Sequence, residues 1–427
     1  MEWIQSLCLC FLMLSTTASL SSDLSGLGRE LLESAREPEF MNWLKGVRRR
    51  LHQYPELTFE EVKTNEFIRT QLDLMGITYT WPVAKTGVMG SIGSGSGLVF
   101  ALRADMDALP ILESIEWEYK SKNQEKMHAC GHDAYVTMLL GAAKLLQSKK
   151  DELKGTVKLL FQPAEEGHAG AYYVLQEGVL DDVQGIFALH VLPYLHTGTI
   201  ASRPGPFLAG SGRFLVTIQE KGGHAAAPHL TADPILAAPF SILALQQLVS
   251  RESDPPEAGV VTVGFIEGGQ AENVIPKIVK FGGTFRSITS EGMSFLRQRI
   301  KEVTETQVTV HRCAAKVDFM DEKFRPYPAT INDETLYEHA KRVGVALLGE
   351  SNVKLDKPGM AAEDFVFYSQ KMPAALFNIG SKNMTLKSDE PLHTQWFILD
   401  KDVLPIGAAL HAAVAISYLN DHPFHLH

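Results

Sequence analysis

The feature that most constrains the fold is an alternation of buried strands and helices. A second series of strands and helices, with a different order, interrupts it. Apolar runs predict strands, and segments with helical spacing lie between them. The strands are at 98–103, 156–161 and 185–191, and the helices at 133–150 and 169–177. A strand–helix–strand order implies parallel strands. We therefore expect an α/β domain with a mostly parallel sheet flanked by helices.

The interrupting segment, residues 207–321, has the order strand, helix, strand, strand, helix, strand. These elements are predicted at 213–220, 233–250, 259–267, 278–285, 292–306 and 308–319. That order is typical of a ferredoxin-like α+β domain. Proline-rich stretches at 204–206 and 325–328 resemble hinges. We predict that residues 23–206 and 322–427 form a catalytic domain and that 207–321 form an inserted satellite domain.

The N-terminal 22 residues differ from the rest of the chain. They are mostly apolar and end in small residues, which is typical of a signal peptide cleaved near Ala18 to Ser22. No later stretch is expected to span a membrane. We expect a protein of the secretory pathway, lumenal in the endoplasmic reticulum or secreted, and the segment 422–427 carries no retrieval signal.

Charge and motifs exclude several function classes. The net charge is −10, and the short basic run Arg48–Arg50 reads as one turn of a helix, so no nucleic-acid surface is expected. A Gly-x-Ser-x-Gly elbow and a His-Glu-x-x-His motif are both missing from the sequence, which argues against a serine hydrolase and a zincin.

Metal-ligating side chains follow successive predicted elements. Taken singly, each has an ordinary explanation as a buried cysteine, a solvated acidic loop or a core histidine. Together they are five ligands beside a spare carboxylate, Glu165, and such a set suits two metal ions that share a water molecule. The five are Cys130, His132, Glu166, His190 and His393.

The order of these motifs resembles a known family. Arg103–Pro110, Met127–Asp133, Gln162–Gly167, Ala188–His190 and the late His393 are similar to motifs of plant indole-3-acetyl-amino-acid hydrolases. Those enzymes are grouped with bacterial aminoacylases and glutamate carboxypeptidases. The resemblance runs from about Leu51 to Leu419 and implies the same two-domain architecture.

The resemblance also implies roles for individual residues. It makes the five side chains the ligands of two divalent metal ions, Mn²⁺ by analogy, although a thiolate ligand also suits Zn²⁺. It makes Glu165 the general base, His224 a catalytic polar group of the satellite domain, and Asp107 and Asp133 the groups that orient ligand histidines. Asn273 and Arg286 are implied to bind substrate, Arg286 by clamping a carboxylate.

The function implied is hydrolysis of the amide bond of N-acyl-amino acids, chiefly indole-3-acetyl conjugates, with release of free auxin. Hydrolysis of jasmonoyl-isoleucine or another acyl-amino acid is the alternative, and a catalytically silent conjugate-binding homologue is a third reading. The expected partners are a small-molecule substrate and a second copy of the chain bound through the satellite domain. Neither nucleic acid nor, after signal cleavage, a membrane is expected. Tyr135 stands where relatives generally carry histidine.

Overall fold

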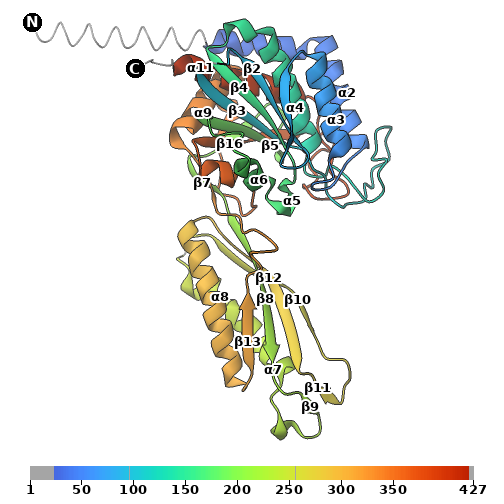
Figure 1. Cartoon of the computed structure of the whole chain (residues 1–427), viewed down its shortest axis with the longest axis vertical. Helices are drawn as coiled ribbons and strands as arrows, with labels where there is room; N and C mark the ends of the chain where they lie inside the picture. Colours follow the sequence, from blue (N-terminus) through green and yellow to red (C-terminus); the bar gives the residue numbers. More distant parts are fainter. Residues whose placement is uncertain (1–23, 96, 255, 423–427) are drawn as a thin grey trace, which may run out of the picture. The chain divides into compact units, whose positions relative to one another are not determined.

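The computed structural model describes residues 24–95, 97–254 and 256–422, so the predicted signal segment lies outside the described residues. The contacts within the chain divide it into two units (Figure 1). Unit 1 runs up to Pro204 and adds Asn332–Asp356 and the chain from Tyr368 onward. Unit 2 comprises Gly205–Ile331 and Lys357–Phe367.

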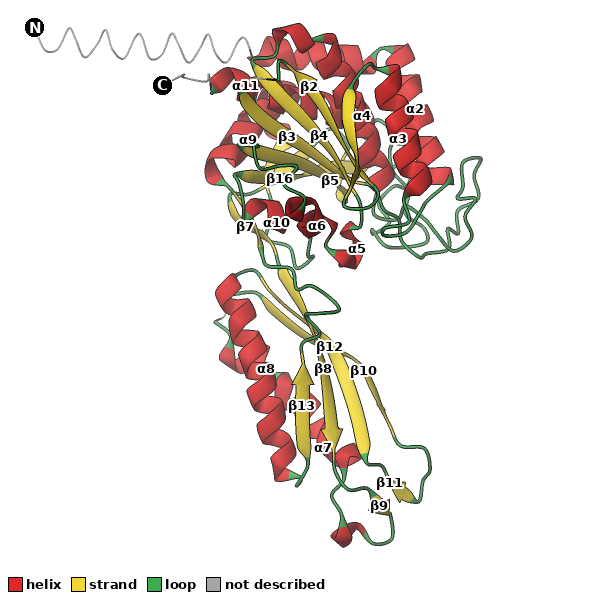
Figure 2. Ribbon diagram, in the orientation of Figure 1, coloured by secondary structure: helices red, strands yellow, loops and turns green. Residues whose placement is uncertain are grey.

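Unit 1 is built on an eight-stranded mixed sheet (Figure 2). The strands β4, β3, β5 and β16 at its centre are mutually parallel, as the strand–helix–strand order predicts. In spatial order the strands are β1 (Thr78–Val83), β2 (Gly87–Gly93), β4 (Gly155–Gln162), β3 (Leu98–Asp105), β5 (Gly185–His196), β16 (Ala374–Lys382), β6 (Ile200–Ser202) and β15 (Val353–Leu355).

Helices cover this sheet. Helix α4 (His132–Ser148) packs against α11 (Val403–Asp421) and against β3, and α2 (Pro38–Gln53) packs on α4. The unit also contains α3 (Val62–Leu74), the short α5 (Glu165–His168), α6 (Gly170–Gln176), α9 (Glu334–Leu348) and a helical stretch at residues 24–36. The fold class predicted from the sequence is thereby confirmed.

Helix α11 corrects one expectation. It is long and apolar enough to cross a membrane by length and composition, although the sequence was expected to hold no such stretch after residue 22. Within the described residues, however, 89% of its apolar window is buried against the rest of unit 1. Its hydropathy is therefore that of a core helix, apolar on all sides because all sides are packed.

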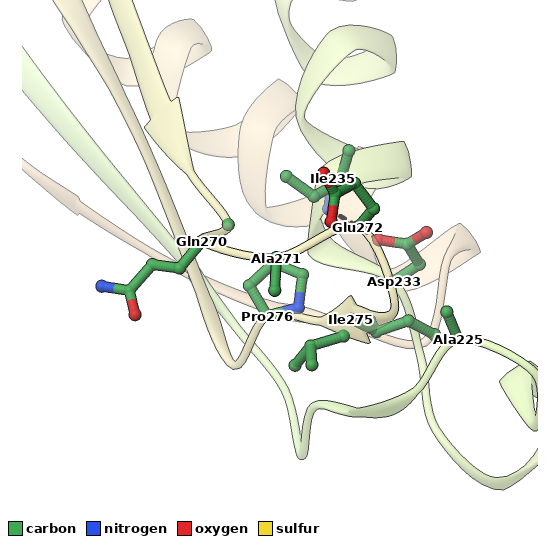
Figure 3. A pocket seen from close by; sticks show the side chains of 10 residues that line it. Ala225, Asp233, Ile235, Gln270, Ala271, Glu272, Ile275 and Pro276 are labelled. Carbon is green, nitrogen blue, oxygen red and sulfur yellow. Dashed lines mark hydrogen bonds between the residues drawn. The ribbon is translucent and has the colours of Figure 1, made fainter.

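Unit 2 contains a four-stranded antiparallel sheet with two helices. The sheet has the order β10 (Gly259–Gly268), β12 (Ile278–Ser287), β8 (Gly210–Gln219), β13 (Ala314–Asp318). Helices α7 (Pro234–Leu245) and α8 (Ser290–Val310) pack against it and on each other. A separate two-stranded ribbon pairs β9 (Gly223–His224) with β11 (Val274–Ile275), and beside it lies a hollow that Ala225, Asp233 and Gln270 help to line (Figure 3).

Two local predictions differ from the structure. The strand predicted at 308–319 begins at Ala314, because α8 continues to Val310. Segment Lys357–Phe367 belongs with unit 2, since Gly359 exchanges backbone hydrogen bonds with Phe207 and Ala209.

Candidate metal centre

The loop before α4 holds Cys130 and His132 close to β5. Gly131 between them has φ +92°, and a Cβ at this position would lie 2.6 Å from Cγ2 of Val191. Only glycine fits such a backbone at such a close approach. The glycine therefore lets the two potential ligands point to the same side, with His132 as the first residue of α4.

Glu165 and Glu166 lie on an irregular turn directly after β4. Ala164 has φ +59° and Gly167 has φ +77°, and both values are left-handed. Asp107 stabilises this turn, because its carboxylate accepts hydrogen bonds from the Glu165 amide at 3.1 Å and the Glu166 amide at 3.0 Å. The backbone of the two adjacent glutamates is thus held in place.

Glu61, the residue directly before α3, stabilises the same turn. It is fully buried and accepts a hydrogen bond from the Ala164 amide at 3.0 Å and one from the Thr86 hydroxyl at 2.5 Å. Burial, with the charge of Asp107, raises the pKa of Glu61 to about 7. Three successive amides of the turn are therefore bound by two buried carboxylates.

His190 and His393 complete the cluster from distant parts of the sequence. Nδ1 of His190 lies 2.8 Å from the carbonyl oxygen of Val191, which leaves Nε2 to face Cys130. The backbone N–H of His393, a residue with φ +60°, donates to the carbonyl of Ala129 at 2.9 Å. This bond holds the late loop against the loop that carries Cys130.

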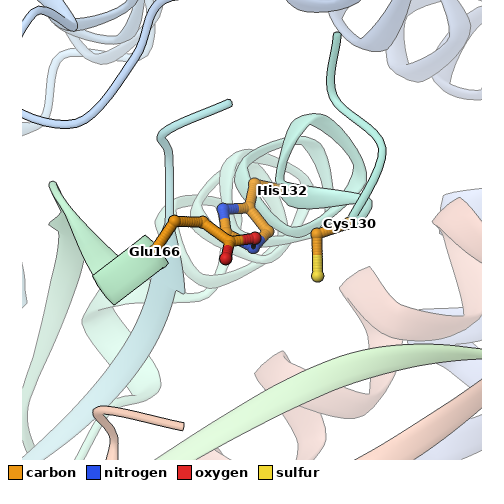
Figure 4. A group of neighbouring side chains, drawn as sticks. All are labelled: Cys130, His132 and Glu166. Carbon is orange, nitrogen blue, oxygen red and sulfur yellow. Dashed lines mark ion pairs between the residues drawn. The ribbon is translucent and has the colours of Figure 1, made fainter. Parts of the chain in front are cut away.

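The structure brings all five predicted ligands together. Cys130 Sγ lies 3.7 Å from His190 Nε2, and Glu166 Oε1 lies 3.9 Å from His132 Nε2 and 3.3 Å from His393 Nε2. Figure 4 shows Cys130, His132 and Glu166 as neighbours, and their ligand atoms lie within 4.8 Å of one another. A second group adjoins it, since ligand atoms of Asp105, His132 and Glu165 lie within 4.8 Å of one another.

The electrostatics of the cluster are those of a cation site. Burial opposes the thiolate of Cys130, but the neighbouring His132, His190 and His393 outweigh it and lower the pKa of the thiol well below its usual range. Burial likewise opposes the imidazolium of His132, and the charges of Asp105 and Cys130 raise its pKa well above the usual range. Hydrogen bonds with Cys130 and Glu166 raise the pKa of His393 to about 10.

The donor set fits divalent metal ions. The raised pKa values of His132 and His393 indicate that the cluster favours positive charge, and metal ions would take the place of protons because metal binding releases protons from ligands. Glu166 Oε1 is buried, and two imidazole nitrogens, those of His132 and His393, lie within 3.9 Å of it. A thiolate, three imidazoles and carboxylates form a mixed set suited to first-row metals such as zinc or manganese.

Asp107 and Asp133, both predicted to orient ligand histidines, behave differently. Asp107 Oδ1 lies 3.4 Å from His132 Nδ1, as an orienting group should. Asp133 instead pairs with two residues of α2, Arg48 Nε at 2.9 Å and His52 Nδ1 at 2.7 Å. Because Asp133 directly follows His132, these contacts connect α2 to the start of α4. Asp133 is therefore adjacent to a potential ligand in the sequence and pairs with α2.

Tyr135 links the two loops that carry Cys130 and His190. Its hydroxyl donates to the carbonyl of Cys130 at 2.8 Å and accepts from the amide of Val191 at 3.0 Å. Its ring lies between two ligand imidazoles, 5.4 Å from that of His132 and 5.3 Å from that of His190, centroid to centroid. The tyrosine is therefore accommodated as a structural bridge at the centre.

The polar residues predicted in the satellite domain do not form one cluster within unit 2. His224 and Asn273 are neighbours on the β9–β11 ribbon, where the Ala225 amide donates to the Asn273 carbonyl at 3.0 Å, and both side chains are exposed. Arg286 lies near the opposite end of β12, eight residues from Ile278 or roughly 27 Å along the strand. Its Nη1 donates to the carbonyl of Met360 at 2.8 Å.

Four residues of the site were not singled out as functional from sequence: Arg48, His52, Glu61 and Asp105. Asp105 had a usable signal, since it ends the buried strand β3 two residues before Asp107. Arg48 and His52 are four apart on α2, and such spacing places both on one helix face. Nothing in the sequence around Glu61 distinguishes it from the exposed Glu60 beside it.

Comparisons with known proteins agree with this geometry. Residues 101–417 match the model of the peptidase family M20/M25/M40. The chain is 50% identical over 404 residues to the IAA-amino acid hydrolase ILR1-like 5 of Arabidopsis thaliana, covering 94% of this chain and 92% of that protein. It is 40% identical over 366 residues to the N-acetyl-L-cysteine deacetylase of Bacillus subtilis, covering 84% of each.

Among solved structures, a dinuclear metal binding peptidase of the M20 family from Bacillus subtilis is similar over 90% of this chain and 99% of that one. The TM-score is 0.78 and the sequence identity is 34%.

Proposed function

The chain is a metal-dependent amidohydrolase that belongs to the peptidase family M20/M25/M40, and from this premise we propose that it cleaves N-acyl-amino acids, chiefly conjugates of indole-3-acetic acid. Glu165 carries the proposal. Its carboxylate lies beside the five converging ligand side chains, and its backbone amide is fixed by Asp107. The relative that is 50% identical supports the choice of acyl group.

Glu165 would act as the proton carrier of the reaction. It would take a proton from the attacking water and deliver it to the nitrogen of the departing amino acid. Cys130, His132, Glu166, His190 and His393 would hold two divalent ions, which when bound polarise the amide carbonyl and activate water. Manganese is proposed from the resemblance to plant enzymes, and metal analysis of the purified protein would distinguish it from zinc.

Residues of unit 2 would bind the rest of the substrate. His224 and Asn273 are exposed donors that can stabilise the oxyanion of the tetrahedral species. Arg286 has a guanidinium oriented by the Met360 carbonyl, which suits a bidentate contact with the amino-acid carboxylate.

A second copy of the chain is proposed to bind unit 2. Four large apolar side chains of α7 are exposed: Ile235 by 43%, Leu236 by 50%, Phe240 by 46% and Leu243 by 68%. Strand β10 is an edge strand and exposes Phe265 by 47% and Ile266 by 54%. Edge strands and apolar patches of this kind are normally covered. Sedimentation analysis of the wild type and of Leu243→Asp tests this, and a wild type that sediments as a monomer would contradict it.

The apolar N-terminal segment supports entry into the secretory pathway, which we also propose. A fluorescent fusion at the C-terminus, compared with the same fusion lacking residues 1–22, should lose its lumenal location on truncation. A cytosolic full-length fusion would overturn this proposal.

The test of the function is turnover of indole-3-acetyl and jasmonoyl conjugates by metal-loaded protein. Glu165→Gln should lower kcat by roughly 10²- to 10⁴-fold, because the proton carrier is lost while the metal ligands remain. Metal content should stay equal to that of the wild type. Glu152→Gln, at an exposed glutamate, is the control and should keep full activity. Absence of turnover by a fully metal-loaded wild type would favour the conjugate-binding homologue.

A further inference from the structure

A cavity of unit 1 lies beside α2, separate from the five ligand side chains. Its volume is about 170 Å³. Two cationic side chains, Arg48 and Lys401, line it together with the apolar and aromatic side chains of Trp117, Phe397 and Leu399. This combination of cations and apolar walls is unlike an ordinary water-filled gap, whose lining is mostly polar.

The carboxylates near this cavity are already satisfied by other groups. Glu113, on its wall, accepts hydrogen bonds from Trp117 Nε1 and the Ser121 amide, both at 2.7 Å, and lies 3.2 Å from His52 Nε2. Asp133, behind the wall, pairs with Arg48 and His52. The negative charges of the region are therefore bound to partners other than Lys401.

Lys401 is a cation without a counterion. In the described part of the chain its ammonium has no carboxylate at ion-pair distance, and its contact is the ring of Trp117, 4.7 Å from Nζ to centroid. Burial, with the charges of Arg48, Arg49 and Lys45, lowers its pKa to about 8. An anion in the cavity would relieve both the burial cost and the repulsion between cations.

We propose that this cavity binds a small monocarboxylate, with its carboxylate at Lys401 and Arg48 and its apolar part against Trp117, Phe397 and Leu399. One unpaired cation matches one negative charge. A volume of about 170 Å³ corresponds to about five or six water molecules at ~30 Å³ each, the size of a branched acid such as 3-methylbutanoate.

The site adjoins two segments that carry ligand residues. Arg48 pairs with Asp133, the neighbour of His132, and Phe397 to Lys401 follow His393 along the chain. A bound acid should therefore stabilise both segments, and we expect it to raise the melting temperature of the metal-loaded protein.

Calorimetric titration of the metal-loaded protein with 3-methylbutanoate tests the proposal, with the neutral 3-methylbutanamide as the comparison ligand. The acid should bind saturably at one site and the amide should not. Lys401→Met keeps the apolar stem and should weaken binding at least tenfold. Lys144→Met is the matched control, because Lys144 also lies 4.7 Å from an indole ring, that of Trp43, but outside the cavity. It should bind as the wild type does.

A second variant tests whether the acid occupies the volume of the cavity, and it leaves the charge of Lys401 unchanged. Leu399→Trp should fill the cavity and abolish binding while Lys401 remains. Binding that is unchanged in Lys401→Met and is lost on metal chelation would place the acid at the metal centre and overturn the proposal. An absence of saturable binding to the wild type would also overturn it.

Discussion

The polar side chains of unit 1 and those of unit 2 are positioned in opposite ways. In unit 1, Asp107, Glu165 and His132 are buried, and each contacts at least one other polar group of the centre. In unit 2, His224 and Asn273 are exposed on a ribbon of two residues per strand.

The difference follows from the cost of burying charge. A buried carboxylate or imidazole must be paired, so its partners fix its position before any substrate arrives. An exposed side chain pays no such cost and is fixed only by what later covers it. The comparison teaches that the ligand side chains are pre-organised within unit 1, whereas the role proposed for unit 2 would depend on binding.

The largest expected effect that sharpens this comparison is that of His224→Ala. Loss of one oxyanion donor typically lowers kcat by roughly 10²- to 10³-fold. The melting temperature should hardly change, because the side chain is exposed and its hydrogen bond, from the Ala226 amide, lies within its own loop. Steady-state kinetics and calorimetry on the same sample measure both quantities.

His229→Ala, at another exposed histidine near the ribbon, is the control and should leave kcat intact. An equal loss in both variants would mean that the ribbon matters through its fold and not through His224.

An intermediate effect is expected at Tyr135, inside the pre-organised unit. Tyr135→Phe keeps the ring between the two imidazoles but leaves the Cys130 carbonyl and the Val191 amide without their partner. Unpaired buried groups of this kind cost about 1–3 kcal/mol of unfolding free energy. Urea unfolding of the metal-loaded protein, together with metal affinity by chelator competition, should show both lowered.

Tyr194→Phe, an exposed position on the same strand as His190, should change neither quantity. Unchanged metal affinity in Tyr135→Phe would show that the bridge stabilises the fold without positioning the ligands.

The smallest effect compares matched helix caps. Asp233 caps α7 in unit 2 by accepting from the Ile235 amide at 2.9 Å, and Asp333 caps α9 in unit 1 by accepting from the Leu336 amide at 2.8 Å. Replacing either by alanine should cost about 1 kcal/mol. We expect Asp233→Ala to lower the unfolding transition of unit 2 alone and Asp333→Ala that of unit 1 alone, as followed by calorimetry with and without metal. A single shared transition in both variants would show that the units unfold together.

Local predictions from the sequence succeeded where one periodicity dominated. Helix α4 and strands β3 and β4 lie within a few residues of their predicted bounds. The end of α8 was misplaced because Val308–Thr309–Val310 alternates like a strand. In the structure Leu296, Ile300, Thr304 and Val308 are buried at intervals of four, so packing continues the helix.

By itself, the sequence determined which residues could form the centre. A cysteine, three histidines and two adjacent glutamates at element ends provide five potential metal ligands and one spare carboxylate. The order of strands and helices directs them to one edge of a sheet. The structure brings those five potential ligands together as expected.

Only the tertiary structure decided which contacts hold these side chains in place. Glu61 reaches Ala164 across 103 residues, His52 reaches Asp133 across 81, and Tyr135 reaches Val191 across 56. Such pairings depend on strand order and helix packing, which bring together side chains without any shared local pattern. Burial then makes each pairing important, because an unpaired buried polar group costs a large share of a net stability of only about 5–15 kcal/mol.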